Sequence, residues 1–182
     1  NYLKKFFLSK KFYHIGPPRD FDLFSLFEKN KCENITDSEY LLCTGLFDDQ
    51  DKDLTYYKNL LQKHINKKMI CTNPDLIVER GDKKEFCAGS IAKIYENIGG
   101  KVEYFGKPYS KIYNLSTDTK NKRVLCIGDN LNTDIRGANM QNFSSLIISS
   151  GIHRNEFKNL NSEIISSKYK VQFDYIQFKL KW

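Results

Sequence analysis

Two carboxylates follow an apolar segment in the second half of the chain. Val124 to Ile127 is apolar and runs into Gly128 and Asp129, and Asp134 follows after a short polar turn. In an open α/β sheet, ligands bind at the carboxyl ends of the parallel strands, so both carboxylates can face one small volume. Their oxygens suit a hard cation such as Mg²⁺. The structural alternative is that Asp129 stabilises a turn and Asp134 caps a helix.

A lysine stands at the end of another predicted strand. Residues 102–105 favour a strand, and Gly106, Lys107 and Pro108 follow it. Pro108 restricts the backbone of the turn, so the chain leaves the strand in a fixed direction. A lysine at a strand end is usually a solvated surface residue. Beside a carboxylate-bound cation, however, it would supply the charge that a phosphoryl group needs.

The elements that must position these residues alternate between strand and helix. Apolar runs predict strands at residues 11–15, 40–46, 69–72, 102–105, 124–127 and 146–148. Helical spacing of apolar residues predicts helices at residues 20–27, 48–65, 90–98 and 135–140, with a short one after Pro108. The tail beyond Asp174 fits either a strand or a helix capped by that residue. This alternation predicts an α/β fold.

Composition narrows the class of protein. The chain has 182 residues, of which 40% are hydrophobic and 28% charged, which excludes a fibrous or wholly disordered protein. No apolar run approaches the ~20 residues that span a bilayer, so we expect a soluble, cytoplasmic protein with no membrane partner. The five cysteines form no Cys-x-x-Cys pair, which favours buried free thiols. The net charge is +7, but the lysines are scattered, so we expect no nucleic-acid partner.

Several short motifs in a fixed order establish a family resemblance. Phe105-Gly-Lys-Pro108 is followed, about twenty residues later, by Ile127-Gly-Asp-Asn-Leu-Asn-Thr-Asp134 and by Gly137-Ala-Asn139. This order resembles the third and fourth motifs of the haloacid dehalogenase (HAD) superfamily. The type-IIA, NagD-like phosphatases of that superfamily also share the motifs Cys71-Thr-Asn-Pro-Asp75, Cys87-Ala-Gly-Ser90 and Ser150-Gly-Ile-His153.

The resemblance implies a fold and a domain organisation. It implies a HAD-like Rossmannoid core built on a parallel sheet, with an inserted α/β cap domain of type C2. On this reading, residues 1–10 end the N-terminal half of the core or form a hinge. Residues 11–104 form the cap domain, and residues 105–182 form the C-terminal half of the core.

The resemblance also implies roles for five residues. Lys107 would be the catalytic lysine that stabilises charge on the transferring phosphoryl group. Asp129 would bind Mg²⁺, and Asp134 would bind this metal or orient the residues around it. Asn73 and Asp75 would lie on a cap loop and contact the substrate, unless they form an Asn-Pro turn. The implied partner is a small phosphorylated metabolite, such as a sugar phosphate or a nucleotide. A homodimer through the cap is also expected.

One motif of the family is missing from the chain. HAD phosphatases use an Asp-x-Asp motif at the end of an apolar strand, whose first Asp attacks phosphorus and whose second is the general acid and base. Asp20-Phe-Asp22 has this spacing but follows no buried strand, and the pairs around Asp51 lie in a polar helix start. The order of motifs in the family places both catalytic aspartates before Asn1. An incomplete parallel sheet would also leave an apolar edge exposed.

We therefore predict a Mg²⁺-dependent phosphatase that works through an aspartyl-phosphate, with this chain inactive by itself. The first alternative is a HAD-fold protein that truly lacks the nucleophile and binds a phosphorylated ligand or a partner chain. A basic nucleic-acid-binding module is the second alternative, and steep salt dependence of DNA or RNA retention would support it.

Overall fold

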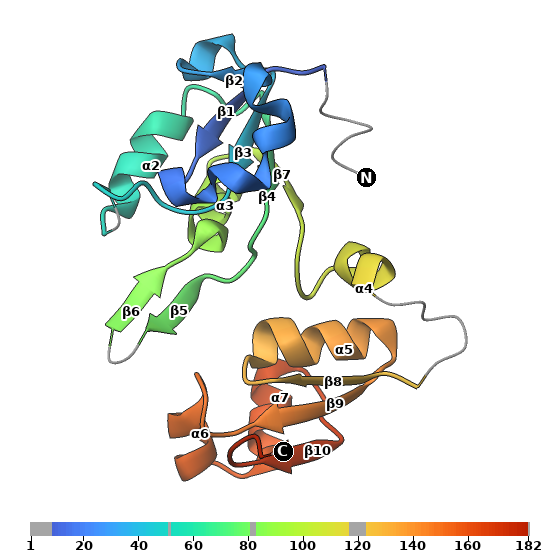
Figure 1. Cartoon of the computed structure of the whole chain (residues 1–182). Coiled ribbons are helices and arrows are strands. Elements are labelled where there is room, and N and C mark those ends of the chain that lie inside the picture. Colours follow the sequence, from blue (N-terminus) through green and yellow to red (C-terminus); the bar gives the residue numbers. More distant parts are fainter. Residues whose placement is uncertain (1–8, 51, 81–82, 117–122, 182) are drawn as a thin grey trace. The chain divides into compact units, whose positions relative to one another are not determined.

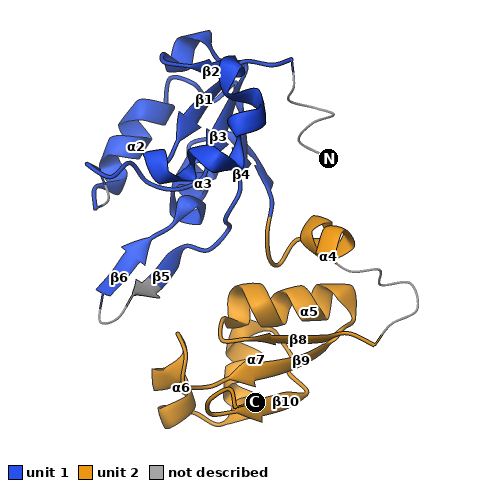
Figure 2. Ribbon diagram, in the orientation of Figure 1, with its two compact units in different colours: residues 1–105 blue, residues 106–182 orange. Residues whose placement is uncertain are grey.

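A computed structural model describes residues 9–50, 52–80, 83–116 and 123–181. The chain divides into two compact units, Asn1–Phe105 and Gly106–Trp182, which are considered separately (Figure 2). The predicted segment 1–10 lies outside the described residues except for its last two. In the part of the chain that the structure describes, no helix is long and apolar enough to cross a membrane.

Unit 1 is built on a five-stranded parallel sheet with the order β2-β1-β3-β4-β7 (Figure 1). Its strands are β1 (Phe12–Ile15), β2 (Lys31–Cys32), β3 (Tyr40–Cys43), β4 (Lys68–Cys71) and β7 (Lys101–Tyr104). The chain first adds β2 on one side of β1 and then adds β3, β4 and β7 on the other side. The sheet is therefore doubly wound, and the chain changes direction across the sheet between β1 and β3.

Both faces of the sheet are covered at its centre, which explains why β3 is apolar and buried throughout and why β4 is so after Lys68. On one face, helices α2 (Leu54–Leu61) and α3 (Ala88–Asn97) pack in a core that includes Leu41 and Met69. On the other face lies an aromatic core, to which Phe24, between the 3₁₀ turns η1 (Pro18–Leu23) and η2 (Ser25–Asn30), and Phe27, in η2, contribute. There the ring centroids of Phe24 and Phe27 lie 5.3 and 5.9 Å from that of Phe12.

The helices of unit 1 differ from the sequence prediction at two places. The α-helix predicted at residues 20–27, with Asp20 as its cap, is wrong. Asp20 lies inside the 3₁₀ turn η1, which begins at Pro18. The predicted helix at 48–65 is shorter: it begins after Asp53, whose carboxylate accepts a hydrogen bond from the Thr55 N–H at 2.8 Å. Ile65 lies beyond its end and is exposed.

Besides the two-residue strand β2, a 3₁₀ turn and a hairpin of unit 1 were not predicted. A short 3₁₀ turn, η3 (Ile35–Asp37), precedes β3. An antiparallel hairpin of β5 (Ile77–Arg80) and β6 (Lys83–Phe86) stands between β4 and α3. The hairpin was missed because its second strand is mostly charged and lacks the apolar alternation that marks a half-buried strand.

Unit 2 contains a parallel three-stranded sheet with the order β10-β9-β8. The strands are β8 (Leu125–Gly128), β9 (Ser144–Ile148) and β10 (Tyr175–Gln177). The helices are α4 (Ser110–Ser116), the π-helical turn η5 (Leu131–Ile135), α5 (Arg136–Gln141), α6 (Arg154–Asn159) and α7 (Ser162–Tyr169). The tail therefore forms a strand, and the alternative of a final helix from Asp174 is wrong.

The sheet of unit 2 is open on one side. Leu131, Ile135 and Ile147 are fully buried together with Ile165 from α7. By contrast, Leu125 and Ile127 on β8 are 47% and 43% exposed. Among the described residues, β8 pairs only with β9, so it is an edge strand.

The five cysteines are free thiols, as predicted. Cys43, Cys71 and Cys87 are buried in unit 1, and burial raises the pKa of the Cys71 thiol to about 12. Burial also raises the pKa of the Cys43 thiol, so Cys43 and Cys71 stay protonated and contribute packing.

Candidate active site

The turn after β8 places two carboxylates at the carboxyl end of this strand. The side-chain oxygen of Asn130 accepts a hydrogen bond from the Asn132 N–H at 2.9 Å and so caps η5. The Asp134 N–H donates to the Asn130 carbonyl at 2.9 Å. The turn therefore folds Asp134 back toward Asp129, as the spacing of the two residues predicts.

Asp134 is buried and uses both of its carboxylate oxygens within the protein. Its side chain is 8% exposed. Oδ2 accepts hydrogen bonds from the backbone N–H groups of Asp129 at 3.2 Å and Asn130 at 3.1 Å. Oδ1 accepts a hydrogen bond from the ammonium group of Lys107. Of the two roles left open for Asp134, these contacts favour orienting its neighbours over binding a metal directly.

Glycine is required beside Asp134. A Cβ atom on Gly128 would lie 2.2 Å from Cγ of Asp134, which is closer than two non-bonded carbon atoms can approach. Gly128 therefore lets the carboxylate approach the end of β8 closely enough to accept the backbone hydrogen bonds of the next two residues.

The loop after β9 holds the carboxylate of Asp129. The backbone N–H of Ile152 donates a hydrogen bond to Oδ2 of Asp129 at 3.1 Å. A Cβ atom on Gly151 would lie 2.1 Å from the same oxygen, so this loop also needs glycine. Within the described part of the chain, Oδ1 of Asp129 makes no hydrogen bond or ion pair. Asp129 thus presents one carboxylate oxygen that a cation or substrate can use.

Lys107 comes from the segment after β7 and reaches the same place. Its ammonium group contacts the Asp134 carboxylate while half of its side chain stays exposed. The Asp134 carboxylate therefore contacts both the Lys107 ammonium and the backbone of Asp129 at the end of β8. The structure brings together the three predicted core residues: Lys107, Asp129 and Asp134.

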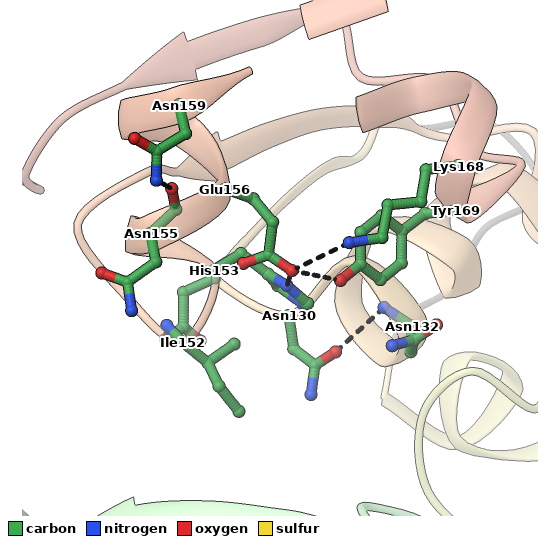
Figure 3. Close-up of polar contacts among 10 residues, drawn as sticks. Asn130, Asn132, Ile152, His153, Asn155, Glu156, Asn159, Lys168 and Tyr169 are labelled. Atoms are coloured by element: carbon green, nitrogen blue, oxygen red, sulfur yellow. Dashed lines mark hydrogen bonds and ion pairs between the residues drawn. The ribbon is translucent and has the colours of Figure 1, made fainter. Parts of the chain in front are cut away.

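A buried histidine follows the loop that holds Asp129 (Figure 3). Nδ1 of His153 lies 3.7 Å from Oε1 of Glu156, and burial lowers the pKa of this imidazole. The same carboxylate oxygen accepts a hydrogen bond from the Tyr169 hydroxyl at 2.6 Å and contacts Nζ of Lys168 at 3.5 Å. These contacts fasten the loop to α7. The motif Ser150-Gly-Ile-His153 was visible in the sequence, but sequence reasoning gave it no role.

Asn73 and Asp75 lie in unit 1, on the loop after β4. The side-chain oxygen of Asn73 accepts a hydrogen bond from the Asp75 N–H at 3.1 Å, and the Asp75 carbonyl accepts one from the Gly89 N–H at 3.2 Å. A Cβ atom on Gly89 would lie 2.2 Å from the Pro74 carbonyl oxygen. These contacts give the loop a defined shape, and they show that Asn73 serves the turn. A contact with substrate stays a prediction for both residues.

The structure offers no replacement for the missing nucleophile among the residues it describes. Asp20 and Asp22 lie in the 3₁₀ turn η1 of unit 1, and Asp49 lies in the loop after β3. Asp51 lies outside the described residues. Nor do the described residues contain a cluster of three or more His, Cys, Asp or Glu side chains that could hold a metal ion. As far as the structure describes it, the site in unit 2 thus has a cation and one available carboxylate oxygen but no Asp-x-Asp pair.

Comparisons with known proteins identify relatives of this fold. Residues 104–169 match a family described as HAD-hydrolase-like. A haloacid dehalogenase-like hydrolase of Brucella suis 1330 is 31% identical, with a TM-score of 0.73 over 84% of this chain and 62% of that one. A possible sugar phosphatase of the HAD superfamily from Cytophaga hutchinsonii is 19% identical, with a TM-score of 0.73 over 100% of this chain and 69% of that one.

A third solved structure shares the same fold. The p-nitrophenyl phosphatase of Archaeoglobus fulgidus is 18% identical, with a TM-score of 0.69 over 97% of this chain and 67% of that one. The chain thus spans 62% to 69% of the length of these three structures. Among curated proteins, none matches the chain.

Proposed function

We propose that this chain, a member of the haloacid dehalogenase superfamily, is the cap and the C-terminal half of the catalytic core of a phosphomonoester hydrolase. One observation carries the proposal: at the end of β8, the buried Asp134 carboxylate contacts the Lys107 ammonium and accepts a hydrogen bond from the backbone N–H of Asp129. A phosphoryl group in transfer carries negative charge on its oxygens, and a positioned cation stabilises that charge.

Each of the three residues has a separate task in this proposal. Lys107 stabilises the charge of the phosphoryl oxygens. Asp134 holds Lys107 in place and fixes the turn by accepting the N–H groups of Asp129 and Asn130. Asp129 is held by Ile152 through one oxygen, and its other oxygen faces the reacting group. The nucleophile is an aspartate upstream of this chain, which forms an aspartyl-phosphate that water then hydrolyses.

The donor chemistry at Asp129 fits Mg²⁺. A carboxylate oxygen without a protein partner is the type of ligand that this hard cation prefers, and Mg²⁺ commonly uses only one or two protein carboxylates. Asp129 would therefore hold the ion, with Asp134 orienting the turn beside it. When bound, Mg²⁺ neutralises charge on the phosphoryl oxygens. The remaining ligands would come from the upstream segment, substrate and water.

The substrate in this proposal is a small phosphorylated metabolite, such as a sugar phosphate or a nucleotide, in the cytoplasm. The names of two relatives support it, a possible sugar phosphatase and a p-nitrophenyl phosphatase. Residues 11–104 would act as the cap, with Asn73 and Asp75 on the loop that contacts the leaving group. The cap would also form the interface of a homodimer.

One observation favours a second candidate function. No described residue of unit 2 supplies the Asp-x-Asp motif, so a HAD-fold protein that binds a phosphorylated ligand without hydrolysing it would have the same site. The two candidates differ in turnover. A catalyst releases phosphate repeatedly, whereas a binding protein retains the ligand intact.

The test uses protein expressed with the coding sequence upstream of Asn1. We expect it to release phosphate from p-nitrophenyl phosphate, to lose this activity in EDTA and to regain it when Mg²⁺ is added. Folded protein that binds p-nitrophenyl phosphate without releasing phosphate would favour the binding protein. Hydrolysis that EDTA leaves unchanged would contradict the metal assignment.

A further inference from the structure

The topology of unit 1 creates a site that the proposed phosphatase function does not use. In a doubly wound parallel sheet, ligands bind outside the carboxyl ends of the strands where the winding direction reverses, because the two flanking loops diverge there and leave a crevice. In unit 1 the reversal lies between β1 and β3, since β2 follows β1 on one side and β3 follows on the other (Figure 1).

A cavity of about 380 Å³ occupies this position, within the usual size range of small-molecule pockets. It is formed by the end of β1, the turn η1, the residues around β2 and the loop after β3. All of its lining residues belong to unit 1: Tyr13, His14, Gly16, Pro18, Phe21, Lys31, Cys32, Glu33, Phe47, Asp48 and Asp49.

The base of the cavity is preorganised. His14 is buried, and its Nε2 atom is hydrogen bonded to Oγ1 of Thr44 at 2.8 Å. A Cβ atom on Gly16 would lie 2.0 Å from that hydroxyl oxygen, so glycine leaves room both for the hydrogen bond and for the cavity. Because the His14–Thr44 pair links the end of β1 to the residues after β3, the two sides of the crevice are held at a fixed separation.

Aromatic rings form flat walls of the cavity. The Phe21 ring lies 5.6 Å from the His14 ring and 5.3 Å from the ammonium group of Lys31. On the other side, the Phe47 ring is stacked on that of Tyr57, with centroids 5.8 Å apart. A planar ring can therefore pack against either wall with little loss of side-chain entropy, because the aromatic residues are already held.

The charges at the cavity favour a hydrogen-bond donor and disfavour an anion. Its charged lining residues are Lys31, Glu33, Asp48 and Asp49, which gives a formal charge of 1 − 3 = −2. Lys31 is paired with Glu33 at 2.9 Å, and Asp48 is paired with Arg19 at 2.7 Å. Among the described residues, the Asp49 carboxylate has no hydrogen bond or ion pair. It is the acceptor that a ligand would use.

We propose that this cavity binds an uncharged, planar nitrogen heterocycle with an amino substituent, the chemistry of a nucleobase in a nucleoside. The ring packs against the Phe21 and Phe47 walls, and the amino group donates to Asp49. The site excludes the phosphorylated form of the same ligand, because the net negative charge of the cavity lining repels the phosphate group. This preference is opposite to that of the site in unit 2, where Lys107 favours phosphate.

The test uses the 182-residue chain and needs no phosphatase activity. Adenosine is titrated while the backbone amide NMR signals of glycine residues are followed. We expect saturable shifts at Gly16 and Gly45, beside the cavity, with Gly128 and Gly151 of unit 2 unmoved. AMP should bind about threefold or more weakly than adenosine, with a difference that shrinks at high salt. Purine riboside, which lacks the amino group, should also bind more weakly.

A matched pair of variants tests the assignment of Asp49. Asp49→Asn should weaken adenosine binding about fivefold to tenfold, since a hydrogen bond to a charged acceptor is replaced by a neutral one. Asp22→Asn removes the same charge from an exposed position of unit 1 that does not line the cavity, and it should leave the affinity unchanged. Circular dichroism checks that both variants fold.

Three outcomes would overturn the proposal: no saturable shift at Gly16 or Gly45, equal affinities for the two variants, or tighter binding of AMP than of adenosine. The last result, with shifts at Gly128 and Gly151, would locate binding at the phosphoryl site in unit 2 instead. Because no hydrolysis is measured, failure here leaves the phosphatase proposal unaffected.

Discussion

The backbone N–H of Ile152 donates a hydrogen bond to Oδ2 of Asp129 at 3.1 Å. This contact joins the loops after two neighbouring parallel strands, β8 and β9. It restrains the rotation of the Asp129 side chain and occupies one of its two carboxylate oxygens. The geometry of the candidate active site therefore depends on a loop that carries none of the family's predicted catalytic residues.

The first prediction concerns Gly151, which lies against Asp129. Gly151→Ala would place a Cβ atom 2.1 Å from Oδ2, so the carboxylate must move. Displacement of a catalytic group by about 1 Å can lower activity about a hundredfold, and we expect a loss of this size in the complete phosphatase. Steady-state hydrolysis of p-nitrophenyl phosphate measures it. Ser150→Ala, one residue earlier, adds no atom and should retain activity; equal losses in both variants would contradict the prediction.

The second prediction separates the roles of the two carboxylates by stability. Asp134→Ala leaves the half-buried N–H groups of Asp129 and Asn130 without their acceptor, which should lower the free energy of unfolding of unit 2 by about 2 to 3 kcal/mol. Asp129→Asn keeps the shape of a partly exposed side chain, so it should lower the free energy of unfolding by less than about 1 kcal/mol. Urea unfolding of the 182-residue chain checks both values. A larger loss of stability for Asp129→Asn than for Asp134→Ala would show that Asp129, and not Asp134, holds the turn.

The third prediction concerns pH and His14. Burial lowers the pKa of His14 from its ordinary 6.5 to about 4. Between these pH values the unfolded chain binds a proton that the folded chain does not, so stability is lost as the pH falls from 6.5 towards 4. The loss from this residue should reach about 3 kcal/mol. Urea unfolding at pH 7 and at pH 4.5 measures this loss. The free energy of unfolding should fall more between these pH values for the wild type than for His14→Gln.

The control for His14 is His64→Gln. His64 is more exposed than His14, so burial lowers its pKa less strongly. This variant should therefore retain most of the wild-type decline. If His14→Gln declines as steeply as the wild type, the imidazole of His14 is not the group responsible.

The sequence predicted the parts of the fold that depend on local apolar patterns. The strands that became β1, β4, β8 and β9 were located to within about two residues, because the strands of a parallel sheet appear as short apolar runs, even at β8, where Leu125 and Ile127 are exposed. The helix capped by Asp20 was wrong for a local reason. Aromatic residues in this segment pack on Phe12 through two 3₁₀ turns, so the spacing of Phe24 and Phe27 resembles a helical pattern without requiring an α-helix.

In the candidate site, too, some features could be predicted from the sequence and others could not. The ordered motifs identified Lys107, Asp129 and Asp134, and the structure brings these residues together. The hydrogen bond from Ile152 could not be predicted, because a backbone donor leaves no signature in residue type and acts from a distant part of the sequence. The close approach of Gly151 to Asp129 was likewise hidden, since a glycine in a loop has several structural explanations.

The fourth prediction concerns the loop after β4. In the complete phosphatase, Asp75→Ala should change the ranking of phosphate esters while sparing a small, non-specific substrate, because leaving-group recognition belongs to the cap in this account. Asn73→Ala removes the oxygen that accepts the Asp75 N–H and should act in the same direction by loosening the turn. A panel of sugar phosphates and nucleotides measures the effect. A parallel change for every substrate would show that both residues only form the turn.

The central claim is that Asp129 and Lys107 form the phosphoryl-handling half of a phosphatase site. The most direct measurement is Mg²⁺-dependent release of phosphate from p-nitrophenyl phosphate by the complete protein, by its Asp129→Asn variant and by the 182-residue chain. The account predicts turnover by the complete protein, a loss of at least about a hundredfold in Asp129→Asn, and none by the 182-residue chain. Undiminished turnover in Asp129→Asn, or turnover by the 182-residue chain that persists after repurification, would contradict it.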